Sequence, residues 1–485
     1  MEDKLAAGSA TLGWRDALTS VSVSLNTTDQ RYRTDFGVPV QGTRPVAPRD
    51  DLQYNDSPEL SRVKSNTIAL NVERKLNDAW LAKLRLLTQR ADTREVDVTP
   101  YRINLDTFDD CSTQTPPQMC RYYFSARPDG RVELDQATLD ITGKFATGGI
   151  NHSILATLET QRSEKTGATY QQTLPSVSFF NPKPINTPRL NTATAFPTDR
   201  DDLSRWSSLT VQDQIDFGSG LHGVVALRHD RTAAVYAAKG TAPNKVNETT
   251  PRIGFVYQLA PSQSVYAQYQ TSLAANNGRN PKDGAALEPE RAKQFELGYK
   301  AQWFDGALAT TLAAYQLEKQ NLADYSLFFA QNILLTTGKA RSRGIEFDAL
   351  GQLSERVSII ASYAYTETEV LEDAFNRGKQ LANVPKHSGS VWARYTLGAY
   401  SFGGGLFAQS QRQGDTANTF QMPGYATVDL MASYAFRMGN GRATVQANLK
   451  NAFNRAYFTG SHQFVTDWVA VGAPRTASLS FRYDF

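Results

Sequence analysis

Five histidines are the residues of this chain whose side chains could act as general bases or as metal ligands. They are His152, His222, His229, His387 and His462. These histidines are scattered over separate segments, and none forms the H-E-x-x-H spacing of a zinc-binding helix. The sequence also lacks a G-x-S-x-G nucleophile turn and a glycine-rich phosphate-binding loop. We therefore predict no catalytic residues and no metal held by the protein, and we expect that the chain is not an enzyme.

The two cysteines of the chain, Cys111 and Cys120, lie close together in a polar segment that contains prolines. Isolated thiols can stay reduced, and the sequence leaves that alternative open. The short separation within an expected loop favours a disulfide formed in an oxidising compartment. We therefore predict a bond between Cys111 and Cys120 on the tip or flank of a long loop.

Aromatic and basic side chains gather in segments that are otherwise polar and rich in proline. These residues are Arg121, Tyr122, Tyr123 and Phe124; Phe179 and Phe180; Tyr325, Phe328 and Phe329; and Trp468. Aromatic rings offer stacking area and arginine offers charge, a combination that suits compact anionic ligands. Alternatively, the rings pack loops together or lie in the aromatic belt at a membrane interface. The sequence leaves both interpretations open.

The final segment, Pro474–Phe485, shows which kind of element must position these residues. Its apolar and polar side chains alternate strictly along the chain. The apolar positions are Ala477, Leu479, Phe481, Tyr483 and Phe485, and the polar positions are Ser478, Ser480, Arg482 and Asp484. A period of two indicates a β-strand with one apolar face, and a face of five apolar residues favours contact with lipid.

The same alternation recurs along the chain in segments of about 9 to 14 residues, a length that suits a tilted span of a bilayer. Short turns, such as 147–149, 218–220 and 439–441, alternate with long loops, such as 231–249 and 455–473. A soluble propeller would need a regular repeat of about 40 to 50 residues, which we do not find. We count roughly 19 strands and predict an all-β, transmembrane antiparallel barrel with short periplasmic turns and long extracellular loops.

Composition agrees with this fold class. The 485 residues contain no apolar run long enough for a transmembrane helix, which needs about 20 residues. Aromatic residues make up 11% of the chain and are mostly Tyr and Phe, as the two aromatic belts of a membrane barrel require. The net charge of +3 is too small to argue for nucleic-acid binding from electrostatics.

Several segments resemble the TonB-dependent outer-membrane receptors, in particular those for ferric siderophores. The closing segments Asn448–Phe458 and Gly472–Arg475 are similar to the closing signature of that family, and the terminal Phe485 resembles the assembly signal of outer-membrane barrels. Further similarity lies in Ser264–Ser272, Leu287–Glu290, Phe295–Lys300, Lys339–Phe347 and Leu381–His387. The resemblance is strong from about residue 250 to residue 485.

This resemblance implies a receptor in the outer membrane of a Gram-negative bacterium that takes up a ferric siderophore and is energised by the TonB complex. Iron would enter only as part of the ligand, and the resemblance implies no cofactor. The other partners would be outer-membrane lipid and the barrel assembly machinery. The aromatic loop clusters would then converge above the lumen and contact the ligand.

Family members carry a signal peptide, a TonB-binding segment and a plug domain before a barrel of about 22 strands. We recognise none of these N-terminal parts, so we expect residues 1–485 to be one barrel domain of an N-terminally truncated chain. The final strand would then lack its partner, which predicts a gap or a distorted closure between residues 7–14 and 478–485. Two alternatives stay open, namely a passive pore and a receptor for another ligand such as cobalamin or a glycan.

Overall fold

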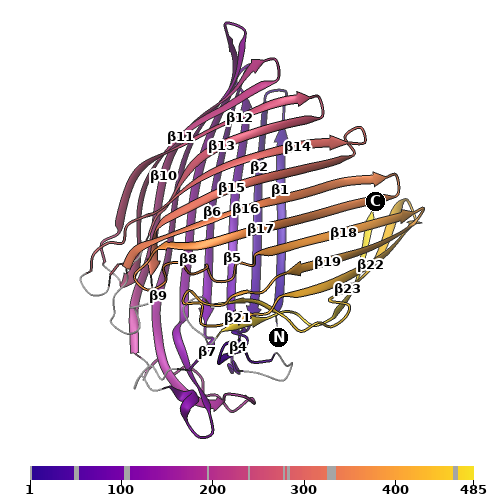
Figure 1. Cartoon of the computed structure of the whole chain (residues 1–485). Helices are drawn as coiled ribbons and strands as arrows, with labels where there is room; N and C mark the ends of the chain where they lie inside the picture. The colour runs from indigo at the N-terminus through magenta and orange to yellow at the C-terminus, as the bar shows by residue number, and fades with distance from the viewer. Residues whose placement is uncertain are drawn as a thin grey trace.

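One antiparallel sheet contains most of the chain (Figure 1). The computed structural model describes residues 3–47, 54–102, 110–193, 196–238, 241–276, 279–280, 284–324, 335–462 and 468–485. Within these residues the main sheet has 20 strands, of which the short β7 (Val98–Tyr101) pairs only with β8. The other nineteen are β1 (Lys4–Arg15), β2 (Thr19–Tyr32), β5 (Ser61–Lys75), β6 (Trp80–Glu95), β8 (Gln118–Thr147), β9 (Ile150–Ser178), β10 (Phe196–Gly218), β11 (Leu221–Ala238), β12 (Asn244–Ala260), β13 (Gln263–Ala274), β14 (Glu290–Trp303), β15 (Leu308–Asp324), β16 (Leu335–Ser354), β17 (Val357–Glu372), β18 (His387–Leu397), β19 (Tyr400–Gln409), β22 (Tyr425–Met438), β23 (Gly441–Lys450) and β26 (Thr476–Asp484).

These nineteen strands follow one another as a meander in which each strand pairs with the next one of the wall. The sheet curves strongly across its width, as the wall of a barrel does (Figure 1). The expected all-β antiparallel barrel of roughly 19 strands is therefore confirmed. Among the described residues, no helix has the length and the apolar character needed to cross a membrane.

The two faces of the wall differ in chemistry because side chains alternate along each strand. Leu312, Phe347 and Tyr363 are cross-strand neighbours on one face, and all three are exposed. Asp348 and Ser362 are neighbours on the opposite face. An exposed apolar face backed by a polar one is the arrangement of a barrel in lipid, with the apolar face outward.

The closing strand β26 follows the same rule. Leu479 and Phe481 are 75% and 58% exposed and lie beside Ala447 and Val445 of β23 on the outer face. Their position agrees with the outward orientation expected from the alternation. The terminal Phe485 is also fully exposed.

An aromatic belt marks one rim of the wall. The exposed rings of Phe145, Phe217, Tyr257, Trp303 and Tyr395 each lie within a few residues of a short turn. The turn between β8 and β9 is typical, since Gly148 and Gly149 have φ of 58° and 89°, values that a two-residue hairpin requires. Aromatic rings prefer the membrane–water interface, so this rim lies at one membrane surface.

At the opposite rim the strands run farther than the sequence predicted. The strands were expected to span about 9 to 14 residues, yet β8 has 30 residues and begins at Gln118, and β9 has 29 residues and continues to Ser178. The expectation was wrong because the alternation reveals a strand only where one face meets lipid. Beyond the lipid both faces meet polar surroundings or other loops, and the period of two disappears.

The two edges of the sheet are β1 and β26. In the described strands β1 pairs with β2 and β26 pairs with β23, and no register joins β1 to β26. Every residue of β1 is exposed. This arrangement agrees with the gap expected between residues 7–14 and 478–485.

Candidate functional site

The long loops at the rim opposite the aromatic belt pack on a hydrophobic core of their own. This core joins the loop between β2 and β5, the facing ends of β8 and β9, the loop between β19 and β22, and the loop between β23 and β26. Its buried members are Val38, Val40, Tyr54, Met119, Val177, Phe179, Phe420, Met422, Phe458 and Val469. Burial of apolar surface therefore stabilises contacts between loops that are far apart in the sequence.

Short hydrogen-bonded segments connect the first and last of these loops. The backbone N–H groups of Val38 and Val469 donate to each other's carbonyl oxygens, both at 2.9 Å. Gly37 comes so close that a Cβ atom there would lie 1.9 Å from the Val469 oxygen, and its φ is +74°. Only glycine fits this position, because it has neither the side chain nor the backbone restriction of other residues.

Arg121 lies at the centre of a second network that ties three loop segments together. Its guanidinium forms an ion pair with Asp56 and donates to the Thr187 hydroxyl at 3.1 Å and to the Pro175 carbonyl at 2.9 Å. Asp56 also accepts from the Ile185 backbone N–H at 2.7 Å. The Arg121 side chain is completely buried, so its charge is balanced by Asp56 within the protein.

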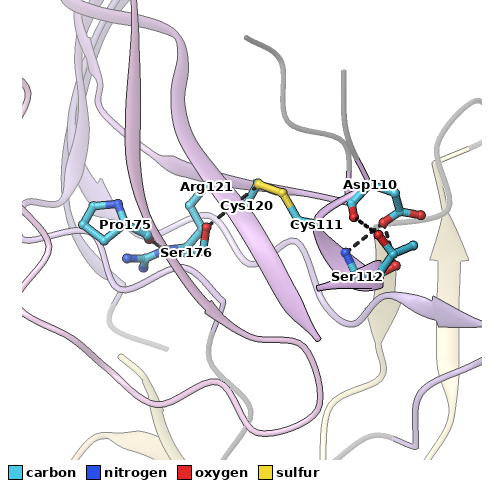
Figure 2. The surroundings of a disulfide bond; sticks show 8 residues. Asp110, Cys111, Ser112, Cys120, Arg121, Pro175 and Ser176 are labelled. Carbon is cyan, nitrogen blue, oxygen red and sulfur yellow. Dashed lines mark hydrogen bonds between the residues drawn. A yellow bond between two sulfur atoms is a disulfide. The ribbon is translucent and has the colours of Figure 1, made fainter. Parts of the chain in front are cut away.

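A disulfide joins Cys111 and Cys120, with Cα atoms 5.9 Å apart (Figure 2). Cys111 begins the 3₁₀ helix η1 (Cys111–Thr113), and Asp110 caps this helix by accepting from the Ser112 N–H at 2.8 Å. Cys120 lies on β8 directly before Arg121 (Figure 2). The bond therefore holds the tip of the β7–β8 loop against the strand that carries the Arg121 network.

Removal of this disulfide is expected to loosen the loop locally. In the chain-entropy model a cross-link of this short separation stabilises by about 2 to 3 kcal/mol. Replacing both cysteines by serine should therefore speed amide hydrogen exchange in residues 110–120 by roughly 30- to 150-fold. Exchange in the distant turn at residues 147–150 should not change. Equal exchange in residues 110–120 of both proteins would show that the bond does not hold the loop.

An aromatic cluster lies beside the disulfide and combines residues from three loops. The Tyr101 ring is 6.1 Å from the Tyr122 ring, 5.6 Å from the Phe124 ring and 5.1 Å from the Trp468 ring, centroid to centroid. Phe36 also lies 5.0 Å from Trp468. Offset and edge-on contacts of this kind stabilise by about 0.5 to 1.5 kcal/mol each. The indole N–H of Trp468 donates to the Pro100 carbonyl at 2.6 Å, which fixes the orientation of its ring.

The cluster has a buried side and an exposed side. Tyr101 and Tyr122 are buried, whereas Phe124 is 39% exposed and Phe36 and Trp468 are partly exposed. The exposed rings thus form an aromatic platform, which we define as Phe36, Phe124 and Trp468. This platform can stack on a planar or apolar part of a ligand.

The residues singled out from the sequence therefore separate into two groups. Arg121, Tyr122, Tyr123 and Phe179 are buried in loop packing, whereas Phe124, Phe180 and Trp468 keep exposed surface. Phe180 is 42% exposed and contacts Phe179 edge-on. Tyr325, Phe328 and Phe329 lie outside the described residues.

Sequence reasoning missed Phe36, Tyr101 and His462, which join the cluster. His462 lies 5.0 Å from Trp468 in an edge-on contact, and Arg102 lies 6.0 Å above the Phe179 ring. Phe36 and His462 are single aromatic residues in long polar loops, so no local pattern marks them. Tyr101 follows a short run that reads Val-Thr-Pro, and its role depends on partners from the last loop.

Burial changes the ionisation of two groups at this rim. It raises the pKa of Tyr123 to about 12, with the charge of Glu59 acting in the same direction. The phenol therefore stays protonated and donates to the Pro188 carbonyl at 2.9 Å. Burial also lowers the pKa of His462, which favours the neutral imidazole beside Trp468.

A hollow of about 550 Å³ lies on the polar inner face near the ends of β14 to β17. Leu317 and Val370 give it an apolar lining, while Lys319 and Glu290 form an ion pair at 3.7 Å within it. The inner face at this rim therefore offers a charged, amphipathic wall in addition to the aromatic platform.

Comparison with known proteins identifies this architecture. Residues 9–452 match the family model described as TonB dependent receptor-like, beta-barrel. The chain belongs to the TonB-dependent receptor family. Members of this family are non-enzymatic transport proteins of the outer membrane of Gram-negative bacteria, so the lipid-facing band described above spans that membrane.

Two curated TonB-dependent receptors show the range of similarity. The metal-pseudopaline receptor CntO of Pseudomonas aeruginosa is 34% identical over 375 residues, which cover 72% of this chain and 50% of that protein. The ferrichrome outer membrane transporter/phage receptor of Escherichia coli is 26% identical over 478 residues, covering 92% and 63%. The chain thus spans between half and two thirds of the length of these two relatives.

Solved structures show the same fold. The crystal structure of BauA, the ferric preacinetobactin receptor from Acinetobacter baumannii, superposes with a TM-score of 0.79 and covers all of this chain and 72% of that one. Sequence identity in this superposition is 21%, so the likeness concerns the fold. In outer-membrane barrels the short turns lie on the periplasmic side and the long loops on the extracellular side. We assign the short turns and long loops of this barrel in the same way.

Proposed function

We propose that this chain is the barrel of a receptor that imports a metal chelate of the siderophore type, energised by the TonB complex in the complete receptor. Family membership supports outer-membrane transport in general. The names of the relatives support the ligand class, since they include a metal-pseudopaline receptor, a ferrichrome transporter and a probable siderophore receptor, PiuA of Acinetobacter baumannii. The barrel and its loops would form the outer part of the ligand site.

The observation that carries this proposal is the aromatic platform of Phe36, Phe124 and Trp468 at the extracellular mouth. A metal chelate presents a compact surface with flat or apolar groups around a polar, often anionic centre. Aromatic rings stack on the flat or apolar groups, and Arg102, which lies above the Phe179 ring, forms an ion pair with Asp110 at 3.0 Å. The chelator holds the metal, and the protein recognises the outer surface of the chelate.

We expect replacement of Trp468 by alanine to weaken chelate binding by roughly thirtyfold or more. A tryptophan that the ligand covers at the centre of a binding site contributes about 2 kcal/mol or more, because it combines a large contact area with few rotatable bonds. Phe124→Ala should weaken binding by about tenfold, since it removes one stacking surface. Binding would be measured on the complete receptor by titration with ferric hydroxamate, catecholate and carboxylate chelates.

Two variants separate contact from loop structure. Trp468→Phe keeps a ring but loses the hydrogen bond to Pro100, so it should retain most of the affinity if stacking is decisive. Phe453→Ala changes a ring that is 79% exposed and lies outside the aromatic cluster, so it should bind like the natural protein. Unchanged affinity in both Trp468→Ala and Phe124→Ala would contradict the platform as ligand site.

The transport step is tested by uptake of the labelled chelate in cells that express the complete receptor. Saturable uptake that stops when the inner-membrane energy source is collapsed would support energised import. Non-saturable leakage that is independent of energy would instead favour a passive pore. If cobalamin or a glycan inhibits uptake and no unlabelled iron chelate does, the ligand class is not the one proposed.

A further inference from the structure

The aromatic platform lies among charged side chains, and their balance determines which net charge a ligand can carry there. The basic side chains that lie closest to its cluster have acidic partners within the protein. Arg102 forms an ion pair with Asp110 at 3.0 Å and donates to the Ser112 hydroxyl at 3.1 Å. Arg121 is completely buried and is neutralised by Asp56. Both guanidinium charges are therefore balanced before any ligand arrives.

An acidic side chain, in contrast, lies next to the platform without a basic partner. Asp35 is exposed and directly precedes Phe36. Its carboxylate accepts the backbone N–H of Gly37 at 2.8 Å, so this hydrogen bond spans Phe36 and keeps the negative charge beside that residue. In the part of the chain that the structure describes, no ion pair joins Asp35 to a lysine or an arginine.

A second carboxylate lies against the same loop segment. Asp97 accepts from the Thr34 backbone N–H at 3.2 Å and from the Thr34 hydroxyl at 2.6 Å, which are both uncharged donors. The basic residue nearest to Asp35 in the sequence is Arg33, whose guanidinium donates to the Ser57 carbonyl at 3.0 Å. Two acids and one base therefore surround this segment, and its net charge is negative.

The loops that carry Phe36, Tyr101 and Trp468 have the same sign of charge in their sequences. Residues 33–60, 96–117 and 451–475 together contain ten acidic and six basic residues. Like charges raise the energy of an anionic ligand at such a site, and salt at physiological strength screens the repulsion over about 8 Å. Charges around a binding site discriminate between ligands more than they add affinity.

We propose that the platform binds metal chelates of zero or positive net charge and discriminates against polyanionic chelates. This charge preference deepens the proposed function and rests on it. Three hydroxamate groups, each with one negative charge, neutralise Fe³⁺, whereas three catecholate groups, each with two, leave a trianion. The rings of the platform offer stacking to both chelates, but the Asp35 carboxylate repels only the second. The ligand class is therefore a ferric trihydroxamate or another chelate without net negative charge.

The test compares three forms of one chelate that differ at its free end. A linear ferric trihydroxamate that ends in an ammonium group is used as such, after acetylation to a neutral amide, and after succinylation to a carboxylate. Affinity is measured by titration of the complete receptor. At low salt we expect the ammonium form to bind roughly tenfold more tightly than the succinylated form, with the acetylated form between them. At about 0.5 M salt this ratio should fall below roughly threefold, because screening weakens attraction and repulsion alike.

Asp35→Asn removes the charge while the side-chain amide oxygen can still accept the Gly37 N–H. It should tighten binding of the succinylated form by roughly three- to tenfold, weaken binding of the ammonium form and leave the acetylated form unchanged. Glu355→Gln is the matched control, because it removes an exposed carboxylate from the periplasmic turn between β16 and β17. It should change none of the three affinities.

Equal affinity for the ammonium and succinylated forms at low salt would overturn the charge preference and leave the platform as a chelate site. A ferric tricatecholate that binds as tightly as the acetylated form would overturn it as well, and so would an unchanged ratio in Asp35→Asn. If Asp35→Asn does not assemble, the salt dependence of the natural receptor decides, and a ratio independent of salt would contradict the proposal. Failure of every chelate to bind would instead overturn the proposed function itself.

Discussion

Replacement of Asp56 by alanine is expected to open the extracellular loops while the barrel wall stays assembled. Asp56 is the ionic partner of the fully buried Arg121 and also accepts hydrogen bonds from Ile185 and Thr187. Its removal leaves a buried positive charge without a counter-ion. Breaking a buried ion pair in this way costs about 3 to 5 kcal/mol, a larger effect than loss of the same contact on the surface.

This loss should appear as faster proteolysis and faster amide exchange in the loops that the network joins. An effect of about 3 kcal/mol raises the population of opened loops by roughly a hundredfold, and cleavage of a transiently opened segment follows that population. The relevant segments are residues 54–57, 118–123 and 174–188. Exchange in the periplasmic turns should stay the same.

Asp29→Ala provides the matched control. It removes the partner of Arg62 in an ion pair whose two side chains are 40% and 31% exposed. Solvent screens such a pair, and the freed arginine stays hydrated, so loop cleavage should hardly change. If Asp56→Ala and Asp29→Ala behave alike, burial of the Arg121 charge does not hold these loops together.

Phe420→Ala is expected to separate the loop between β19 and β22 from the first loop. The Phe420 ring is buried in the loop core and covers Gly414, where a Cβ atom would lie 2.0 Å from the ring. The next residue, Gln421, donates its backbone N–H to the Thr43 carbonyl at 3.1 Å. Truncating a buried phenylalanine costs about 3 to 5 kcal/mol, because contacts are lost and a cavity remains.

Hydrogen exchange would again locate the effect. Residues 37–46 and 413–422 should exchange faster together, since one core stabilises both loops. Phe453→Ala removes the same ring from an exposed position and should leave both segments unchanged. Faster exchange in residues 413–422 alone would mean that the first loop is held by its other contacts, such as the Val38–Val469 pair.

The two predictions also bear on ligand binding. Tyr122 lies directly after Arg121 and contacts the Tyr101 ring. The Tyr101 ring in turn packs against the rings of Phe124 and Trp468. Loosening the Arg121 network should therefore weaken chelate binding without removing any exposed ring of the platform. Such an effect on affinity would appear together with faster loop exchange, whereas Phe124→Ala should change affinity alone.

The sequence predicted the barrel wall well because the pattern that reveals a membrane-spanning strand lies within that strand. Each strand within the membrane has one face in lipid and one face toward the lumen, so its residues alternate with a period of two. The alternation that includes Leu479 and Phe481 therefore predicted both the strand β26 and its outward face. The sequence did not predict the extracellular ends of β8 and β9, because neither face of the strands contacts lipid there and their residues do not alternate between apolar and polar.

The candidate site shows what local pattern cannot reveal. The run Arg121 to Phe124 suggested four side chains available to a ligand, but only Phe124 keeps substantial exposure. Arg121 is buried because Asp56, which lies 65 residues earlier, supplies its counter-charge. Nothing in the sequence connected Phe36 or His462 with this cluster, since each is a lone aromatic residue until the fold brings it beside Trp468.

The sequence by itself therefore determined the class of fold, the strands that cross the membrane, their outward faces and the family. These features depend on alternation within a strand and on short family motifs, both of which involve neighbouring residues. The tertiary structure alone decided which loop residues are buried and which form the aromatic platform. Burial of a charge or a ring depends on partners from other loops or strands, and hydrophobic packing is non-directional, so sequence neighbours do not specify those partners.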